Sequence, residues 1–304
     1  MSLFKLISPK KFVELVAKET NRRVVPVDAT WYMPNDPRDA KKEFLEGERI
    51  PNSVFFDIDA VKDTKSQYPH MVPDIKTFNE GMSKLGLKRD DILVVYDRVG
   101  NFSSPRCVWT IGLFEHPNLY LLNNYNLYKG AGYPLDSSKK EEVTDYPTSN
   151  YVAESSVAID EVVPFENIVG LVESGDIRTK YNVVDARALA RFEGKAPEPR
   201  PIIPSGHVPG AHPLPFGEIL DKDTKAYPET PEEMLAVLNQ ATEKLGYTIN
   251  PKKPTIAMCG TGITGCIIKT AIEHAGLKMV RLYDGSWTEY AQRVDSSKIA
   301  KNRD

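Results

Sequence analysis

Residues 255–265 read Thr-Ile-Ala-Met-Cys-Gly-Thr-Gly-Ile-Thr-Gly, an apolar run that ends at Cys259 and continues into a glycine-rich loop. The apolar run is typical of a strand, and the apolar-periodic segment after Gly265 predicts a helix. In such a strand–loop–helix turn, the loop N–H groups and the positive end of the helix face the residue that ends the strand. They favour a thiolate over a thiol, so we expect Cys259 to be a nucleophile.

The loop after the cysteine has the composition of an anion cradle. Glycines allow a backbone to fold tightly around one atom without clashes of Cβ. We therefore expect Gly260, Gly262 and Gly265 to let the loop fold around the Cys259 sulfur. The residues expected to bind the substrate are Gly260, Gly262, Ile263 and Thr264.

The two halves of the chain repeat one order of predicted elements, in which helices alternate with short apolar strands. Asp28 and Asp97, at the ends of two strands of the first half, lie 69 residues apart, and their counterparts in the second half lie 74 apart. Residues 49–53 also match residues 207–211. The predicted strands are 24–29, 92–97 and 120–122 in the first half and 182–186, 255–258 and 280–283 in the second. The predicted helices are 12–16, 76–85 and 108–114, then 168–172, 232–245 and 266–274.

This repeat predicts the fold class and the domains. Helices that alternate with β-branched runs indicate a mainly parallel sheet flanked by helices on both faces. We predict two tandem α/β domains, at 1–136 and 157–304. Residues 137–156 are rich in Ser, Lys, Glu and Thr and lack periodicity, so we expect a linker there.

The two copies differ at one chemically decisive position. Asp97 in the first copy aligns with Cys259 in the second, and the first copy lacks the Gly-x-Gly loop. We therefore expect the first domain to be catalytically degenerate and to supply a wall of the site.

Composition narrows the class of function. The chain has 304 residues, a net charge of −3 and no apolar run long enough to span a membrane, so we expect no direct nucleic-acid binding and no membrane attachment. Three cysteines form no disulfide framework and fit a reducing compartment. The first 23 residues carry six basic and two acidic side chains. They fit a mitochondrial address, although Ser8-Pro9 before an apolar stripe also predicts an ordinary helix start.

Two other classes of enzyme use a cysteine in a comparable loop. A Cys-x5-Arg phosphatase needs an arginine six residues after the cysteine, where this chain has Gly265. A Cys–His hydrolase needs a base close to the cysteine, and His70 serves only if the fold brings it there. No Walker loop is present, and His207 and His212 lack partners at zinc-ligand spacing, so we expect no metal and no cofactor.

Taken together, these motifs resemble two-domain rhodanese-type sulfurtransferases. The resemblance rests on the tandem repeat, the loop at Cys259, the Asp284-Gly285-Ser286-Trp287 segment after the last strand and the Pro197-Glu198-Pro199-Arg200 segment. The loop is similar to that of 3-mercaptopyruvate sulfurtransferases, because thiosulfate-preferring members place basic residues directly after the cysteine. Over its whole length the chain is most similar to the fungal sulfurtransferase linked to tRNA thiouridine modification.

The resemblance implies a reaction, its partners and a location. Cys259 would take sulfur from a small anionic donor, 3-mercaptopyruvate or thiosulfate, as a covalent persulfide. It would pass the sulfur to a thiol, to cyanide or to a partner protein such as a cysteine desulfurase or a sulfur-carrier activating protein, in the cytoplasm, the mitochondrion or both. An alternative of another class is a sulfur-relay or interaction protein whose small-molecule turnover is incidental.

The resemblance also implies roles for side chains outside the loop. Arg191 and Arg200 would hold the donor's carboxylate and carbonyl, whereas the alternative is that both are solvated loop arginines. Thr261, His70 and Asp59 would relay a proton; threonine stands where family members commonly have serine, and its methyl group restricts χ1. The alternative for His70 is a structural hydrogen bond.

Three further residues have plainer expected roles. Arg187 is expected to pair with Asp185. Cys107 and Cys266 lie in apolar helical runs and are expected in the core rather than in the chemistry.

Overall fold

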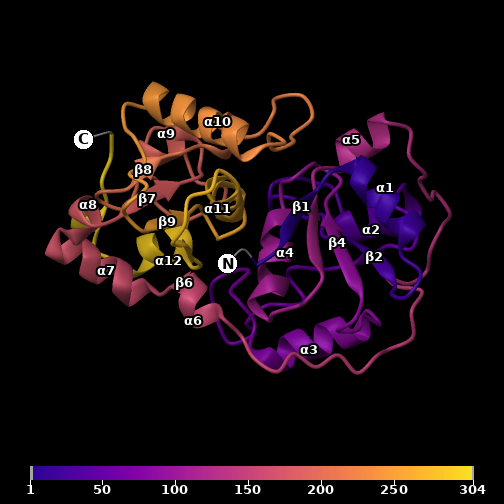
Figure 1. Cartoon of the computed structure of the whole chain (residues 1–304). Coiled ribbons are helices and arrows are strands. Elements are labelled where there is room, and N and C mark those ends of the chain that lie inside the picture. Colours follow the sequence, from indigo (N-terminus) through magenta and orange to yellow (C-terminus); the bar gives the residue numbers. More distant parts are fainter. Residues whose placement is uncertain (1–2, 303–304) are drawn as a thin grey trace. The chain divides into compact units, whose positions relative to one another are not determined.

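The computed structural model describes residues 3–302 and divides them into two compact units (Figure 1). Unit 1 takes in the described residues up to Lys65 together with Val72–Ala158 and Lys222–Ala226. Unit 2 takes in Ser66–Met71, Ile159–Asp221 and the described residues from Tyr227 onward. Each unit therefore includes one short segment from the other half of the sequence.

Unit 1 is built on a five-stranded sheet with the order β1-β5-β4-β2-β3, in which every strand pair is parallel. Parallel neighbours need crossover connections, and the helices between the strands provide them. The elements are β1 (Lys5–Ile7), α1 (Pro9–Lys18), β2 (Val24–Asp28), α2 (Ala40–Glu46), β3 (Val54–Phe55), α3 (Ile75–Lys84), β4 (Ile92–Tyr96), α4 (Ser104–Leu113), β5 (Leu119–Leu122) and α5 (Tyr125–Gly130).

Unit 2 repeats this architecture with the order β6-β10-β9-β7-β8, again parallel throughout. Each strand takes the place of its counterpart in unit 1, which confirms the predicted repeat and the α/β fold class. The elements are α6 (Ala158–Glu161), β6 (Val162–Val163), α7 (Phe165–Ser174), α8 (Asp176–Thr179), β7 (Asn182–Asp185), α9 (Leu189–Phe192), β8 (His212–Pro213), η1 (Phe216–Glu218), α10 (Pro231–Lys244), β9 (Thr255–Met258), α11 (Gly265–His274), β10 (Val280–Tyr283), α12 (Ser286–Arg293) and η2 (Ser296–Lys298).

The central strands are covered on both faces. All five residues of β4 are buried, as expected for a parallel strand between two layers of helices. Alternate residues Val94 and Tyr96 pack in a cluster with Phe12 of α1 and Tyr128 of α5. α4 packs against β4 and β5. The apolar run of the sequence thus becomes the middle of a three-layer domain.

The core of unit 2 follows the same rule. Ile256 and Met258 of β9 lie in one cluster with Ile168 of α7 and Tyr290 of α12. α11 packs against β9 and β10 and also contacts α10. The end of β9 is therefore held between packed layers, which gives the residue after it a rigid position.

Helix starts follow the local sequence signals. Ser8 accepts a hydrogen bond from the N–H of Lys11 at 3.3 Å and Pro9 is the first helical residue, as predicted. α10 begins with a capping box between Thr230 and Glu233. No helix within residues 3–302 has both the length and the apolar character needed to span a bilayer.

The strands that were not predicted are the short ones, β1, β3, β6 and β8, with two or three residues each. A run this short carries no periodicity, so only its pairing with a neighbour identifies it. Two isolated bridges, Arg49 with Asp136 and His207 with Ala300, precede β3 and β8 at matching places. They confirm that residues 49–53 and 207–211 are equivalent.

Residues 137–156 contain neither helix nor strand. The segment follows α3 in unit 1, where the N–H groups of Ser149 and Tyr151 donate to the carbonyl and the hydroxyl of Ser83, at 3.0 and 2.9 Å. The side chains of Tyr151 and Ala153 are buried. The polar sequence is therefore anchored by a few apolar side chains.

Candidate active site

Cys259 directly follows β9, the middle strand of the unit 2 sheet, and only 2% of its surface is exposed. Residues 260–264 form a loop, and α11 begins at Gly265 with its N-terminus next to that loop. The predicted strand–loop–helix turn is thus present. It lies at the carboxyl edge of a parallel sheet, which is where ligands bind in open α/β folds.

Two glycines of this turn have positions that other residues fit poorly. Gly262 has φ of +78°, in the left-handed region. A Cβ on Gly265 would lie 3.0 Å from Cδ1 of Leu282 and 3.2 Å from the carbonyl carbon of Met258. Gly265, which excludes a phosphatase arginine, therefore lets the helix approach the sheet closely.

The backbone of Cys259 is clamped by the first turn of α12. Its N–H donates to Oγ of Ser286 at 3.1 Å, and its carbonyl accepts from the N–H of Trp287 at 2.9 Å. The next carbonyl, of Gly260, accepts from the N–H of Thr288 at 2.9 Å. These bonds hold the peptide groups on either side of Cys259 in one geometry. The only sequence signal for this role was the polar segment that follows β10.

Arg191 lies against the cysteine loop. Its Nη2 is 3.4 Å from the point that a Cβ on Gly260 would occupy. Its guanidinium forms an ion pair with Glu198, with Nε donating to Oε2 at 3.1 Å. The Arg191 side chain is 20% exposed and Glu198 is 4% exposed, so the guanidinium is paired and mostly buried beside the cysteine loop. Its contact with the donor stays a prediction.

Arg187 pairs with Asp185, as predicted from the sequence. Its Nη2 is 2.6 Å from Oδ2 of Asp185 and its Nη1 is 2.7 Å from Oε1 of Glu198. Its guanidinium also stacks 4.5 Å above the ring of Trp287. Burial disfavours the charge, but the two carboxylates outweigh this effect and raise the pKa of Arg187. The guanidinium is therefore fully committed within the protein.

The segment Ser66–Met71 brings His70 to Arg200 within unit 2, with Nε2 of the histidine 3.4 Å from Nη2 of the arginine. His70 is 3% exposed and has φ of +61°, a backbone conformation that histidine adopts at local cost. Thr261 is also buried in the cysteine loop. Sequence reasoning did not predict the contact between His70 and Arg200, because 130 residues separate them.

Asp59, the third member of the proposed relay, lies in unit 1. Its carboxylate accepts a hydrogen bond from Nε1 of Trp31 at 3.0 Å and lies 3.7 Å from Nζ of Lys62. Its side chain is 44% exposed. Its part in a relay stays a prediction.

The other two cysteines are buried, as predicted. Cys107 in α4 and Cys266 in α11 are each 1% exposed. Burial raises the pKa of the Cys107 thiol well above its usual range. Sγ of Cys266 donates to the carbonyl of Gly262 at 3.4 Å, so this thiol packs beneath the loop.

The equivalent loop of unit 1 holds an anion of its own. Asp97 follows β4 as Cys259 follows β9, and its side chain is buried. Five backbone N–H groups and one hydroxyl donate to its carboxylate. These donors are the N–H groups of Val99 (3.0 Å), Gly100 (2.7 Å), Phe102 (2.8 Å), Ser103 (3.0 Å) and Ser104 (2.8 Å), and Oγ of Ser104 (2.6 Å). A loop of this type therefore gathers its donors around one anionic point.

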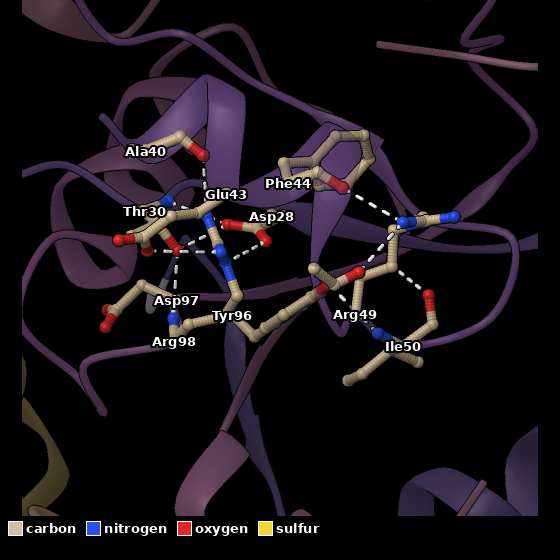
Figure 2. Close-up of polar contacts among 12 residues, drawn as sticks. Asp28, Thr30, Ala40, Glu43, Phe44, Arg49, Ile50, Tyr96, Asp97 and Arg98 are labelled. Carbon is tan, nitrogen blue, oxygen red and sulfur yellow. Dashed lines mark hydrogen bonds and ion pairs between the residues drawn. The ribbon is translucent and has the colours of Figure 1, made fainter. Parts of the chain in front are cut away.

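Arg98, the residue after Asp97, is held by partners within unit 1. Nε of Arg98 lies 2.8 Å from Oδ2 of Asp28, and its Nη2 donates to the carbonyl of Ala40 at 2.6 Å (Figure 2). Nη1 of Arg98 is 3.4 Å from Oε2 of Glu43. Arg98 thus pairs with the aspartate of β2 as Arg187 pairs with the aspartate of β7. The loop of unit 1 therefore has no thiol, and its arginine, Arg98, is already paired with carboxylates and a carbonyl of unit 1.

Comparison with known proteins places this geometry in a family. The model of the rhodanese-like domain matches residues 170–293. The chain is 57% identical over 304 residues to the thiosulfate sulfurtransferase TUM1 of Saccharomyces cerevisiae, with both chains covered completely. It is 37% identical to a probable 3-mercaptopyruvate sulfurtransferase of Schizosaccharomyces pombe, covering 97% of this chain and 96% of the relative.

Solved structures agree with the sequence relatives. The crystal structure of the Saccharomyces cerevisiae Tum1 protein matches with a TM-score of 0.97 at 56% identity, over the full length of both chains. A sulfur transferase subunit of yeast mitochondrial complex I matches with a TM-score of 0.82 at 36% identity, over 98% of this chain and 100% of that one. The chain therefore belongs to the two-domain rhodanese-type sulfurtransferases, the family of the thiosulfate and 3-mercaptopyruvate enzymes.

Proposed function

We propose that this sulfurtransferase carries sulfur as a persulfide on Cys259. The thiolate attacks the sulfur of the donor, a new S–S bond forms, and the donor's bond to that sulfur breaks. With 3-mercaptopyruvate the C–S bond breaks, its electron pair goes to carbon, and pyruvate leaves after that carbon takes up the donor thiol's proton. With thiosulfate, sulfite leaves. An acceptor then removes the outer sulfur and restores the thiolate, so the cycle needs no cofactor.

The observation that carries this proposal is the set of hydrogen bonds that the equivalent loop of unit 1 donates to Asp97. There, five N–H groups and a hydroxyl converge on a single anionic side chain. The loop after Cys259 occupies the same place in the same fold and starts from a backbone clamped by α12. Preorganised donors of this kind stabilise a thiolate and a persulfide anion without reorganising during the reaction.

Two arginines are proposed to hold the donor. Arg191 lies beside Gly260, and Arg200 lies beside His70 in the same unit. Guanidinium groups suit the planar carboxylate of mercaptopyruvate, which can accept two parallel hydrogen bonds. The residues after Cys259 carry no positive charge, so we propose that 3-mercaptopyruvate is preferred to thiosulfate. Backbone contacts to the donor are assigned to the loop at 260–264.

Proton transfer is proposed for Thr261, His70 and Asp59. Transfer from mercaptopyruvate moves the thiol proton of the donor to its carbon, so a relay of hydroxyl and imidazole speeds the step. The buried position of Thr261 beside Cys259 and the contact of His70 with Arg200 support the first two.

The acceptor and the cellular role are also proposals. The match to a relative that is a subunit of mitochondrial complex I supports a protein partner and a mitochondrial location. We propose that sulfur passes to a protein thiol, supplied or received by a cysteine desulfurase or a sulfur-carrier activating protein, and feeds tRNA 2-thiouridine formation in the mitochondrion or cytoplasm. The alternative is a sulfur-relay protein in which small-molecule turnover is incidental. Faster discharge of labelled persulfide onto a partner protein than onto cyanide or small thiols would favour it.

A comparison of the two donors tests the proposed preference. We expect kcat/KM with 3-mercaptopyruvate to exceed that with thiosulfate by about tenfold or more, because one charge-assisted carboxylate contact is worth that much. Steady-state kinetics with a common thiol acceptor measure both values. A higher kcat/KM with thiosulfate would overturn the assignment of the donor.

The Arg200→Ala variant tests the second arginine. We expect kcat/KM for mercaptopyruvate to fall by roughly 10- to 100-fold, since the donor loses a charged contact, while Tm changes by only a few degrees. The matched control is Arg178→Ala, an exposed arginine on α8 at the opposite, amino edge of the sheet. An unchanged kcat/KM for Arg200→Ala would return this residue to the role of a solvated loop arginine.

A further inference from the structure

Glu198 joins two arginines of unit 2, Arg187 and Arg191. One carboxylate oxygen, Oε1, lies 2.7 Å from Nη1 of Arg187, and the other, Oε2, accepts from Nε of Arg191 at 3.1 Å. The Glu198 side chain is 4% exposed. A buried carboxylate is stable only when its charge is compensated, and here two guanidinium groups share that task.

These pairs form one chain of alternating charge within unit 2. Asp185, at the end of β7, holds Arg187, which is also fixed by the carbonyl of Gly206 at 2.7 Å and by the ring of Trp287. Arg187 holds one oxygen of Glu198, and the other oxygen holds Arg191. The guanidinium of Arg191, which lies against the cysteine loop, is thereby fixed relative to strand β7.

We infer that Glu198 is a positioning residue that orients Arg191 toward the sulfur donor; this rests on the proposed role of Arg191. An arginine has four flexible side-chain torsions, and their freedom opposes binding unless another group has already fixed them. The bonds of Arg191 to Glu198 use Nε and Nη2. Among the described residues, Nη1 has no hydrogen-bond partner, so it is left for the donor's carboxylate, and the side chain loses little further freedom when the donor binds.

This inference predicts an effect on donor binding rather than on the chemical step. The carboxylate of Glu198 is buried against Arg187 and Arg191, so we expect it to act on the donor only through Arg191. Its loss should then raise KM and leave kcat nearly constant. An opposite expectation follows if the negative charge of Glu198 simply repels the donor's carboxylate, because removing it would then lower KM. The sign of the change in KM separates the two roles.

The test uses Glu198→Gln and Glu198→Asp in the full chain, with steady-state kinetics on 3-mercaptopyruvate. Glutamine presents an amide N–H to one of the two arginines, and aspartate is one methylene too short to reach both. We expect each variant to raise KM by roughly tenfold, the worth of one charge-assisted hydrogen bond, with kcat within about twofold of the native value. The control is Glu218→Gln, which removes the carboxylate from an exposed pair with Lys244.

A double-mutant cycle with Arg191→Ala decides whether Glu198 acts through Arg191. If it does, Arg191→Ala raises KM at least as much and Glu198→Gln adds nothing in that background. Additive effects, a lower KM or a change in Tm without a change in KM would each overturn the inference. If Arg191→Ala itself leaves KM unchanged, the proposed donor grip fails and the inference falls with it. If only the Glu198 variants leave KM unchanged, the grip stands and the inference alone falls.

Discussion

The Cys259→Ser variant is expected to lose sulfur transfer by a factor on the order of 10³ or more, because a serine hydroxyl neither forms an anion readily at neutral pH nor attacks sulfur well. Treatment of the native chain with donor should add one sulfur atom. The variant should acquire none, because its oxygen occupies the position at which the S–S bond forms. Intact-mass measurement before and after donor treatment, together with initial rates, gives both results.

The matched control for this experiment is Cys107→Ala. Cys107 is buried in α4 of unit 1 and its thiol has a strongly raised pKa, so we expect this variant to acquire the sulfur as the native chain does. Addition of sulfur to Cys259→Ser, with continued turnover, would show that another group carries the persulfide.

Asp97→Ala is expected to destabilise the protein by about 4 kcal/mol or more. The substitution leaves five backbone N–H groups and the hydroxyl of Ser104 without their carboxylate acceptor in a buried loop, and each such loss costs roughly 1–3 kcal/mol before water enters. For a domain of this size, we expect Tm to fall by roughly 10 °C. Scanning calorimetry of the full chain measures the change.

The control for Asp97→Ala is Asp57→Ala. Asp57 is exposed in the same unit, and its carboxylate accepts from two backbone N–H groups, of Asp59 and Ala60, so its loss should cost about 1 kcal/mol. Sulfate should recover more Tm for Asp97→Ala than it adds to the native chain, because it can fill the vacated cradle. A destabilisation below about 1 kcal/mol would show that the loop does not depend on the anion.

The fold was largely accessible from the sequence because its signals are local. The longer strands, such as β4 and β9, are continuous apolar runs, and helices such as α10 begin with capping residues that act within four positions. The strands that escaped prediction have two or three residues and exist only through their neighbours.

Some features of the candidate site could likewise be predicted from the sequence, and others could not. The location of Cys259 followed from the order of strand, loop and helix, and the presence of Asp97 in place of a cysteine in the equivalent loop of unit 1 followed from the repeat. The pairing of Arg187 with Asp185 was predicted from the sequence, and the structure shows it. The bonds of Glu198 to Arg187 and Arg191 were not predicted, since these residues lie close together in the sequence and several pairings fit it. The contact of His70 with Arg200 joins residues 130 positions apart.

The repeated α/β architecture, the place of Cys259 at the end of a strand and the family were all predicted from the sequence. Periodicity, glycine spacing and helix capping depend on residues that are close together in the chain, so they can be recognised in the sequence alone. The tertiary structure alone decided that Asp97 fills its own cradle, that Ser286 clamps Cys259 and that Glu198 holds Arg191. Each of these depends on where buried charges and hydrogen-bond donors meet after folding. Such groups must find partners once water is removed, and the partners are chosen by proximity in space rather than by order along the chain.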